Sequence, residues 1–414
     1  EDRTDQLPFT ADDDPEIRGQ DLAMLGESGF VNSFDPWQEA LLDPHPRVRR
    51  FAALGLSYLL RFDREQIRLD KREVKQRKGA DADSVQLSLT FNDVSDFMEL
   101  AGDDLLLRHR AAILTADIIG FSRRMIVDEG RDFFPLWLAT LTKFPEPNTR
   151  MAFLLALRQL KEPAIEQFLA DPDPMLVVEA ARAINDAPID SAMPALASWL
   201  ANGAVLPDSE LTASLSEKDY ADLVLRPALR RALNASFRVG GSGNAGSLSV
   251  FAAAPEIRGS RREEAHFKSV VEEGRAEALL MLSEWADPSP RDKVLGLHRP
   301  LDVRDGAVAS SALSETFDAL MQDQTVSVQV AAINAAAGLN LDSKGEQLSG
   351  IVGDLNVEGK VRAAALKALA KMQAAEFEEA LAVARADFDP HVRRASVLVT
   401  SMSSSGAAAP ALAK

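Results

Sequence analysis

Apolar residues along this chain recur at three- and four-residue spacing within short segments that are rich in alanine, valine and leucine. This spacing places them on one face of an α-helix, where they supply a buried stripe. Alanine at successive positions lets neighbouring helices approach closely. The alternation typical of a half-buried strand is convincing at residues 84–90 and nowhere else. The hydrophobic pattern therefore predicts an all-α protein.

A short motif precedes several of these segments: an Asp-Pro pair, then a Val-Arg or similar pair, then the apolar helix. The clearest copies are DPHPRVRR at residues 43–50 and DPHVRR at residues 389–394. Asp is suited to cap a helix and Pro to its first turn. Weaker copies make Val328, Val361 and Val392 equivalent, at steps of 33 and 31 residues. A period just above thirty fits two short helices and two turns, which predicts a HEAT-type α-solenoid of stacked helical hairpins.

Changes in composition divide the predicted array. We expect an N-terminal extension over residues 1–34, front repeats over 35–236, rear repeats over 261–402 and a flexible tail over 403–414. Residues 237–260 are rich in Gly, Ser and Ala, and this composition predicts a linker or hinge between the two groups of repeats.

An insert over residues 67–90 interrupts the front repeats, because a charged stretch is followed there by the alternating segment. It is predicted to form a loop with a short strand. Its basic side chains are candidates for contact with a partner subunit: Arg68, Lys71, Arg72, Lys75, Arg77 and Lys78. Arginines of the helical repeats are expected instead to stabilise the seams between repeats. These seam candidates are Arg47, Arg49, Arg108, Arg182, Arg362 and Arg393.

The charge of the chain narrows the class of partner. Its 414 residues include 46 Lys and Arg against 63 Asp and Glu, a net charge of −17. Such a balance repels phosphate backbones, so nucleic acid is not an expected partner. There is no Cys, which excludes disulfides, thiolate catalysis, Cys-ligated zinc and covalent c-type haem attachment within these residues. No apolar run approaches the length that spans a bilayer, so we expect no direct membrane span.

Other motifs in the sequence do not indicate a catalytic, metal or cofactor site. The GSGNAG run at 241–246 matches the dinucleotide fingerprint, but no hydrophobic strand precedes it, and we interpret it as a flexible turn. Asp12, Asp13 and Asp14 lack the spacing of a calcium loop and are interpreted as a solvated tail. The five histidines are scattered, with His45 and His391 interpreted as equivalent repeat positions. The sequence thus predicts no catalytic residue, metal or cofactor. The four tryptophans are interpreted as core residues, with partner anchors as the alternative.

Several segments together resemble a known family. They are DPHPRVR at 43–49, EAARAIND at 179–186, LNASFR at 233–238, WADPSPRDKV at 285–294 and RPL at 299–301. Their order resembles the HEAT-repeat region of large exported proteins of planctomycete and verrucomicrobial type, the membrane-bound dehydrogenase or haem-binding domain proteins. In that family the repeats lie between a β-propeller and a c-type haem domain, and this sequence contains neither. The resemblance implies export, with a periplasmic location favoured over the cytoplasm.

Three functional hypotheses follow. The first is a non-catalytic scaffold or docking module that holds other protein subunits, with a c-type cytochrome or a dehydrogenase as the partner that the resemblance implies. The second is the repeat region of a larger sugar or alcohol dehydrogenase whose catalytic and haem domains are absent here. The third is a HEAT-like enzyme such as a bilin lyase; a DNA glycosylase on the same fold is opposed by the acidic charge. We favour the first, because repeat arrays form long binding surfaces and no catalytic set is visible.

Overall fold

A computed structural model describes the chain over most of its length. The described residues are 12–28, 35–60, 106–108, 110–114, 116–117, 146–206, 209–254, 257–258, 261 and 263–403. The chain forms two compact units, residues 1–165 and residues 166–414. The charged insert predicted over residues 67–90, with its strand at 84–90, lies outside the described residues.

The first unit is built around α3. Its helices whose bounds are described are α1 (Pro15–Ser28), α2 (Asp35–Leu41), α3 (Pro46–Leu60) and α8 (Pro147–Leu160), and residues 106–108, 110–114 and 116–117 are also helical. Both α1 and α2 pack on α3. The crossing of α1 and α3 is close, because a Cβ at Gly26 would overlap the backbone of Gly55. Trp37 is buried and donates through Nε1 to the Leu22 carbonyl at 3.0 Å. Residues 15–28 therefore form a packed helix, and the prediction of an extension over 1–34 is wrong for them.

The second unit contains eleven described helices of nine residues or more. They are α9 (Pro174–Asp186), α10 (Met193–Ala201), α13 (Arg226–Val239), α14 (Gly241–Ala253), α15 (Ala265–Ser283), α16 (Gly306–Met321), α17 (Val326–Gly338), α18 (Gly345–Gly353), α19 (Gly359–Met372), α20 (Phe377–Arg385) and α21 (Pro390–Ser403). Shorter helices are η3 (Pro163–Ala170), which spans the boundary of the two units, η4 (Asp190–Ala192), α11 (Glu210–Ala213), α12 (Glu217–Tyr220), η5 (Ala221–Leu225) and η6 (Asp342–Lys344).

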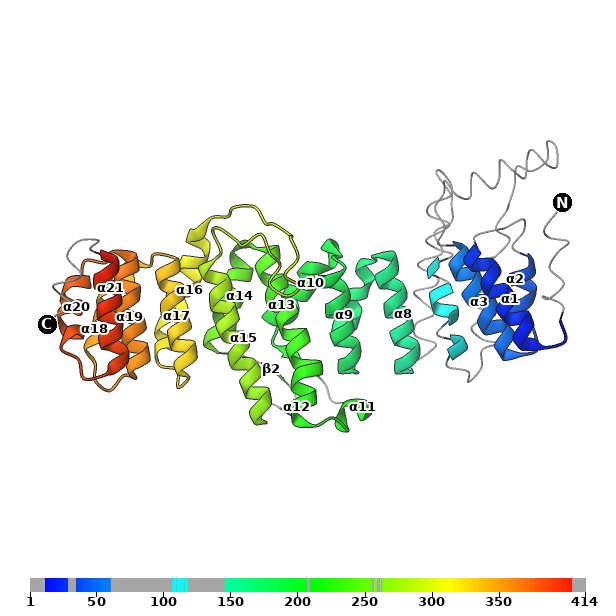
Figure 1. Ribbon diagram of the computed structural model, residues 1–414, viewed down its shortest axis with the longest axis horizontal. Helices are drawn as coiled ribbons and strands as arrows, with labels where there is room; N and C mark the ends of the chain where they lie inside the picture. Colours follow the sequence, from blue (N-terminus) through cyan, green and yellow to red (C-terminus); the bar gives the residue numbers. More distant parts are fainter. Residues whose placement is uncertain are drawn as a thin grey trace. The chain divides into compact units, whose positions relative to one another are not determined.

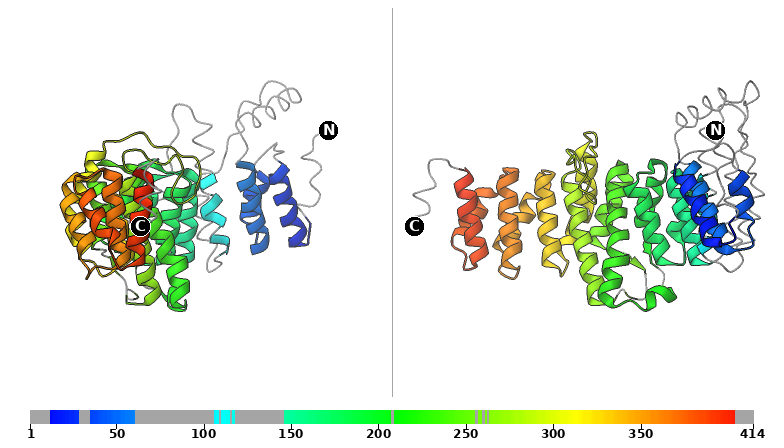
Figure 2. Two further views of the ribbon diagram at one scale, coloured as in Figure 1. Left: turned by 60° about the vertical axis from the view of Figure 1, so that its left-hand side comes forward. Right: turned by 45° about the vertical axis from the view of Figure 1, so that its right-hand side comes forward.

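These helices form two layers, and the chain passes back and forth between them (Figure 1). In one layer α9 packs on α13, α13 on α15, and the series continues through α17, α19 and α21. In the other layer α10 packs on α14, α14 on α16, and α18 on α20. The turned views keep the same order of neighbours (Figure 2). The predicted all-α solenoid of stacked helical hairpins is confirmed.

The repeat motif marks where the helices begin. Helices α17, α19 and α21 start at residues 326, 359 and 390, which reproduces the steps of 33 and 31 residues. Asp173 accepts a hydrogen bond from the Met175 amide at 2.9 Å, and Asp389 accepts one from His391 at 2.7 Å. Carboxylates in these positions satisfy amide groups that the first helical turn leaves unpaired.

The first acidic run belongs to the same motif. Asp14 accepts from the Glu16 amide at 2.8 Å, and Asp12 accepts from the Asp14 amide at 2.8 Å. Asp13 and Asp14 are exposed, as predicted for a solvated run, but Asp12 and Asp14 also organise the start of α1, so the run leads directly into a helix and is not a tail.

The structure also corrects the alignment of the two histidines. Because α3 begins at Pro46 and α21 at Pro390, His391 is the second helical residue, whereas His45 precedes its helix. The position of His45 corresponds to Asp389. The His45 ring accordingly accepts the Arg47 amide through Nδ1 at 3.3 Å. The predicted equivalence of His45 and His391 is wrong, because the two helix starts are offset by two residues in that alignment.

Residues 237–260 do not form a linker throughout. The GSGNAG run begins α14, whose Leu248 and Phe251 are buried between neighbouring helices. A Cβ at Gly243 or Gly246 would meet nothing within 4 Å, so these glycines face open space while the apolar residues supply the packing. The interpretations as a hinge and as a flexible turn are wrong for residues 241–253.

Two short strands occur where none was expected. Strand β1 (Ala204–Val205) pairs in parallel with β2 (Ile257–Arg258), with Ala204 opposite Ile257. They lie near α11 and α12, beside the lower ends of α13 and α15, and the long connection of residues 284–305 passes over the opposite, upper ends of the helices (Figure 1). Within the described part of the chain, we find no helix with the length and hydropathy needed to cross a membrane.

Candidate functional site

A groove of about 700 Å³ lies on the face formed by α17, α19 and α21. All three helices contribute to its lining. The lining residues are Val326, Ser327, Val330 and Asn334 of α17, Lys360, Ala363, Ala364 and Lys367 of α19, and His391, Arg394, Ala395 and Leu398 of α21. Repetition thus forms one continuous surface from three successive repeats.

The lining residues occupy matching positions in their helices. The second, fifth and ninth residue of each helix line the groove: Ser327, Lys360 and His391; then Val330, Ala363 and Arg394; then Asn334, Lys367 and Leu398. Residues at this spacing lie on one side of a helix. The groove therefore depends on the helices starting in register, which the loops before them determine.

A buried arginine fixes the register of α19 and α21. Arg362 donates through Nε to the Val357 carbonyl at 3.1 Å and forms an ion pair with Asp387, which precedes α21. Both side chains are almost fully buried. Burial alone would raise the pKa of the Asp387 carboxyl, but hydrogen bonds from the Asp389 amide and Arg362 outweigh it, and this pKa lies below its ordinary value.

Gly359 permits a close approach between the start of α19 and the loop that precedes α21. A Cβ at this first residue of α19 would overlap the carboxylate of Asp389, the residue that caps α21. The absent side chain leaves room for the loop of the next repeat to lie against the start of α19.

The fourth residue of α21 forms hydrogen bonds to the loop that directly precedes this helix. Arg393 donates through Nη1 to the carbonyl oxygens of Asp387 and Phe388 at 3.1 and 2.6 Å. Arg49, the fourth residue of α3, makes the same two contacts with Asp43 and Pro44 at 2.7 and 3.0 Å. The same arginine-to-loop hydrogen bonds therefore occur at the starts of two helices, α3 and α21.

A corresponding pair anchors α17. Asp323 accepts from the Thr325 amide at 2.8 Å and forms an ion pair with Arg275 of α15. Burial would raise the pKa of Asp323, but hydrogen bonds from Arg275 and the Thr325 amide, together with the Arg275 charge, hold it below its ordinary value. Helices α17 and α21 are therefore each held by an acid that precedes the helix in the chain and an arginine on the neighbouring helix.

The cations that line the groove differ from those that hold the repeats together. These cations are Lys360, Lys367 and Arg394; they are exposed, as is His391, and in the described part of the chain none of these four side chains has a hydrogen bond or an ion pair. Lys344, in contrast, pairs with Asp318 at 3.0 Å.

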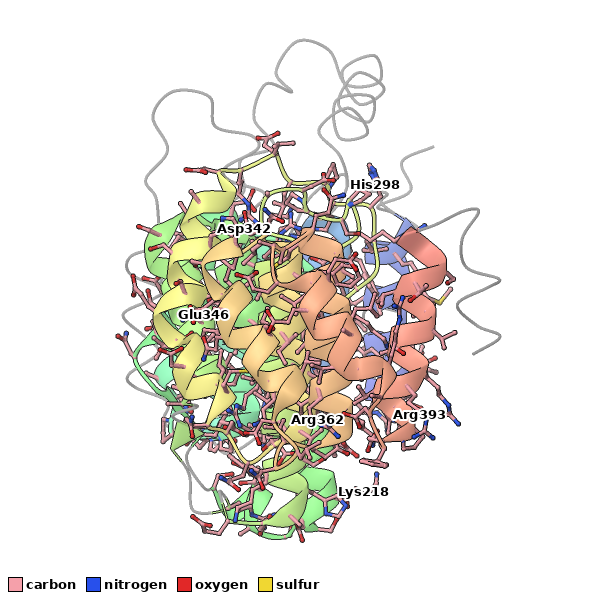
Figure 3. All side chains as sticks on the ribbon, turned by 90° about the vertical axis from the view of Figure 1, so that its left-hand side faces the viewer. Lys218, His298, Asp342, Glu346, Arg362 and Arg393 are labelled. Atoms are coloured by element: carbon pink, nitrogen blue, oxygen red, sulfur yellow. The ribbon has the colours of Figure 1, made fainter. Side chains whose placement is uncertain are left out.

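None of the aspartates and glutamates described over residues 306–403 lines the groove. Figure 3 shows Asp342 and Glu346 on one side of the stack and Arg393 of α21 on the other. Within an acidic chain, this surface is locally cationic.

The lining of the groove is suited to binding. It offers positive charge around an apolar floor of Ala363, Ala364 and Ala395, and no carboxylate is placed there to act as a base. Among the residues that the structure describes, no cluster of His, Asp and Glu could hold a metal ion.

The remaining seam candidates occupy several settings. Arg47 forms an exposed ion pair with Glu16 of α1, and Arg108 pairs with Glu146 before α8 at 3.0 Å. Arg182 pairs with Glu179 at 3.5 Å within α9 itself. The partner-binding candidates Arg68, Lys71, Arg72, Lys75, Arg77 and Lys78 lie outside the described residues.

A second polar cluster lies under the connection of residues 284–305. The Asp292 carboxylate is fully buried and accepts from Asn234 of α13 at 3.0 Å, from Arg299 at 3.1 Å, and from the Val294 and Leu295 amides at 2.9 Å each. Burial would raise the pKa of Asp292, but these hydrogen bonds and the Arg299 charge hold it below its ordinary value.

An arginine next to this cluster packs against two aromatic rings. The Arg304 guanidinium lies 4.1 Å from the ring centre of Trp285 and 4.7 Å from that of Phe237. It also donates to the Phe237 carbonyl and to the Trp285 carbonyl. Trp285 is buried and meets Phe237 edge-on. The arrangement serves as a latch that closes the connection onto α13.

The cations of the groove are not among the residues predicted from the sequence. Arg362 and Arg393, which the repeat motif indicated, support the helices without lining the surface. A usable signal was present: once each helix start is aligned on its Asp-Pro or Glu-Gly pair, Lys360 and His391 share the second position and Lys367 lies at the ninth.

Comparisons with known proteins identify no family. No family model matches the chain, and no curated protein matches it. Among solved structures, the crystal structure of an engineered protein is similar over 96% of this chain and 97% of its own, with 16% sequence identity and a TM-score of 0.37. At that level of similarity the match carries no functional argument.

Proposed function

We propose that the chain is a non-catalytic repeat scaffold that docks another protein subunit on the face of α17, α19 and α21. The observation that carries the proposal is the groove itself: three repeats present exposed side chains in register, and its cations have no partners in the described part of the chain. Long surfaces of this kind are the usual product of stacked repeats.

The sequence resemblance extends the proposal to a location and a partner class. It supports an exported, periplasmic protein whose docked subunit is a c-type cytochrome or a dehydrogenase. The acidic balance of the chain supports a protein partner and not a nucleic acid.

Photo-cross-linking tests the docking role. A benzophenone amino acid replaces Asn334 or Lys367 in the groove, or Glu346 on α18 as a control on the other layer, and the full chain is irradiated in extracts of the cells that produce it. We expect one discrete adduct from both groove positions and none from the control. Equal labelling from all three positions, or no adduct from the groove, would contradict the proposal.

A further inference from the structure

The groove differs in charge from the molecule that carries it. Over residues 306–403, the described cations outside the groove are Lys344, Arg362, Arg385, Arg393 and Lys371, and the first four of these hold an acid, a hydroxyl or a carbonyl. The groove cations hold nothing in the described part of the chain. Unpaired cations gathered on a surface attract an anionic partner and guide its approach.

The spacing of these cations restricts the anion. Lys360 and Lys367 are seven residues apart on α19, which is about 10 Å along a helix that rises 1.5 Å per residue. That spacing is wider than a single phosphate or carboxylate group, so it favours a ligand that carries more than one anionic group. A peptide in the extended polyproline II conformation advances about 3.1 Å per residue with three residues per turn, so carboxylates three residues apart lie on the same side, at about the spacing of the two lysines.

The floor of the groove adds a second requirement. Ala363, Ala364 and Ala395 expose only methyl groups there, with Val330 beside them and the half-exposed Leu398 at the rim. An apolar side chain of the ligand would be removed from water on this floor. No Phe, Tyr or Trp lines the groove, so it lacks the large aromatic rings on which the bases of single-stranded nucleic acid stack.

We infer that the groove takes a carboxylate-rich, extended segment of a partner protein, with two acidic residues about three positions apart and an apolar residue between them. Lys360 and Lys367 receive the two carboxylates, His391 and Arg394 line the side formed by α21, and the alanines receive the apolar side chain. This inference rests on the proposed docking function and specifies the chemistry of the docked subunit.

The test uses the full chain and a fluorescent twelve-residue peptide in which Glu recurs every third position with Leu between. Binding is measured by fluorescence anisotropy at low and moderate salt. A peptide with Gln in place of Glu is the matched ligand control. We expect the Glu peptide to bind at least about ten times more tightly, with a difference that shrinks as salt screens the charges.

Charge reversal on the protein provides the second arm. Lys360→Glu, Lys367→Glu and Arg394→Glu each weaken binding by about 5-fold, the size expected for one exposed ion pair, and together by on the order of 100-fold. Lys371→Glu is the matched control, since it changes the same charge on the same helix one turn beyond the groove. The four side chains are exposed, and circular dichroism with thermal melting confirms that the variants fold.

The outcomes separate the inference from the proposed function. Equal binding of the Glu and Gln peptides, equal loss in Lys367→Glu and Lys371→Glu, tighter binding of a single-stranded oligonucleotide, or full competition by millimolar inorganic phosphate would each overturn the inference. A groove cross-link that persists in the triple variant would overturn it while leaving the docking function standing. Absence of any groove cross-link would overturn both.

Discussion

Arg299 donates through Nη1 to the carbonyl oxygen of Asn185, 2.9 Å away and 114 residues earlier in the chain. Asn185 lies near the end of α9, whereas Arg299 belongs to the connection between α15 and α16. In a stack where most contacts join neighbouring repeats, this hydrogen bond reaches back across α13. The buried carboxylate of Asp292 holds Arg299 in place, so the connection acts as a brace.

Removing the Asp292 carboxylate should destabilise the second unit strongly. Asp292→Ala leaves Arg299 and the nearby Arg238 without their shared partner in a buried site, and such losses cost about 3–5 kcal/mol. Urea unfolding followed by circular dichroism measures the change. Asp287→Ala alters an exposed acid of the same connection and should change stability little. Equal effects of the two substitutions would rule out a bracing role.

The acid sensitivity of the second unit should depend on Asp323. Its pKa is below the ordinary value in the folded chain, so the stabilisation it gives is present above the unfolded pKa of about 3.9 and is lost as the pH falls through the folded pKa. Asp323→Asn should therefore be less stable than the parent at pH 7 and lose less stability between pH 5 and pH 3. Thermal melting across that range gives the pH dependence of stability for the parent and for the variant. Equal pH dependence of the two would contradict this role of Asp323.

Arg304 should not be replaceable by lysine. The planar guanidinium lies against Trp285 and Phe237 and donates to two carbonyls, whereas an ammonium group cannot match that geometry. Arg304→Lys should cost about 1–3 kcal/mol and change the emission of Trp285. Arg291→Lys, on the exposed part of the same connection, is the control. An unchanged emission spectrum together with unchanged stability would count against the latch.

Two glycine substitutions should act in opposite directions. Gly26→Ala places a Cβ on the backbone of Gly55 and should separate α1 from α3, at a cost of about 1–3 kcal/mol. Gly350→Ala, inside α18, meets nothing within 4 Å and should stabilise its helix by about 0.5–1 kcal/mol. Hydrogen exchange resolved to individual peptides reports each region separately. Loss of protection at α18, or none at α1, would contradict this account.

The sequence predicted the helix starts well, because capping is a local event. Asp173 and Asp389 act within two residues of their own position, so a motif of four residues carries the information. The steps between α17, α19 and α21 follow from the same signal, and so does the all-α solenoid.

Where the prediction failed, the deciding contact came from a distant segment. The composition of residues 241–246 suggested a turn, yet Leu248 and Phe251 lie against neighbouring helices, and tertiary packing outweighs the low helix propensity of glycine. The groove was missed for a related reason. A lysine on a helix is visible in the sequence, but whether it keeps a free charge depends on which acids the adjacent repeats bring close.

The brace under residues 284–305 has a mechanical consequence. A chain of repeats with contacts only to nearest neighbours yields to tension one hairpin at a time, in many small steps. Pairs α18–α19 and α20–α21 have that form and should peel singly from the C-terminal side. Arg299 and Asp292 tie α9, α13 and the connection into one crosslinked block, so that region should resist a pulling force and then rupture in a single larger extension.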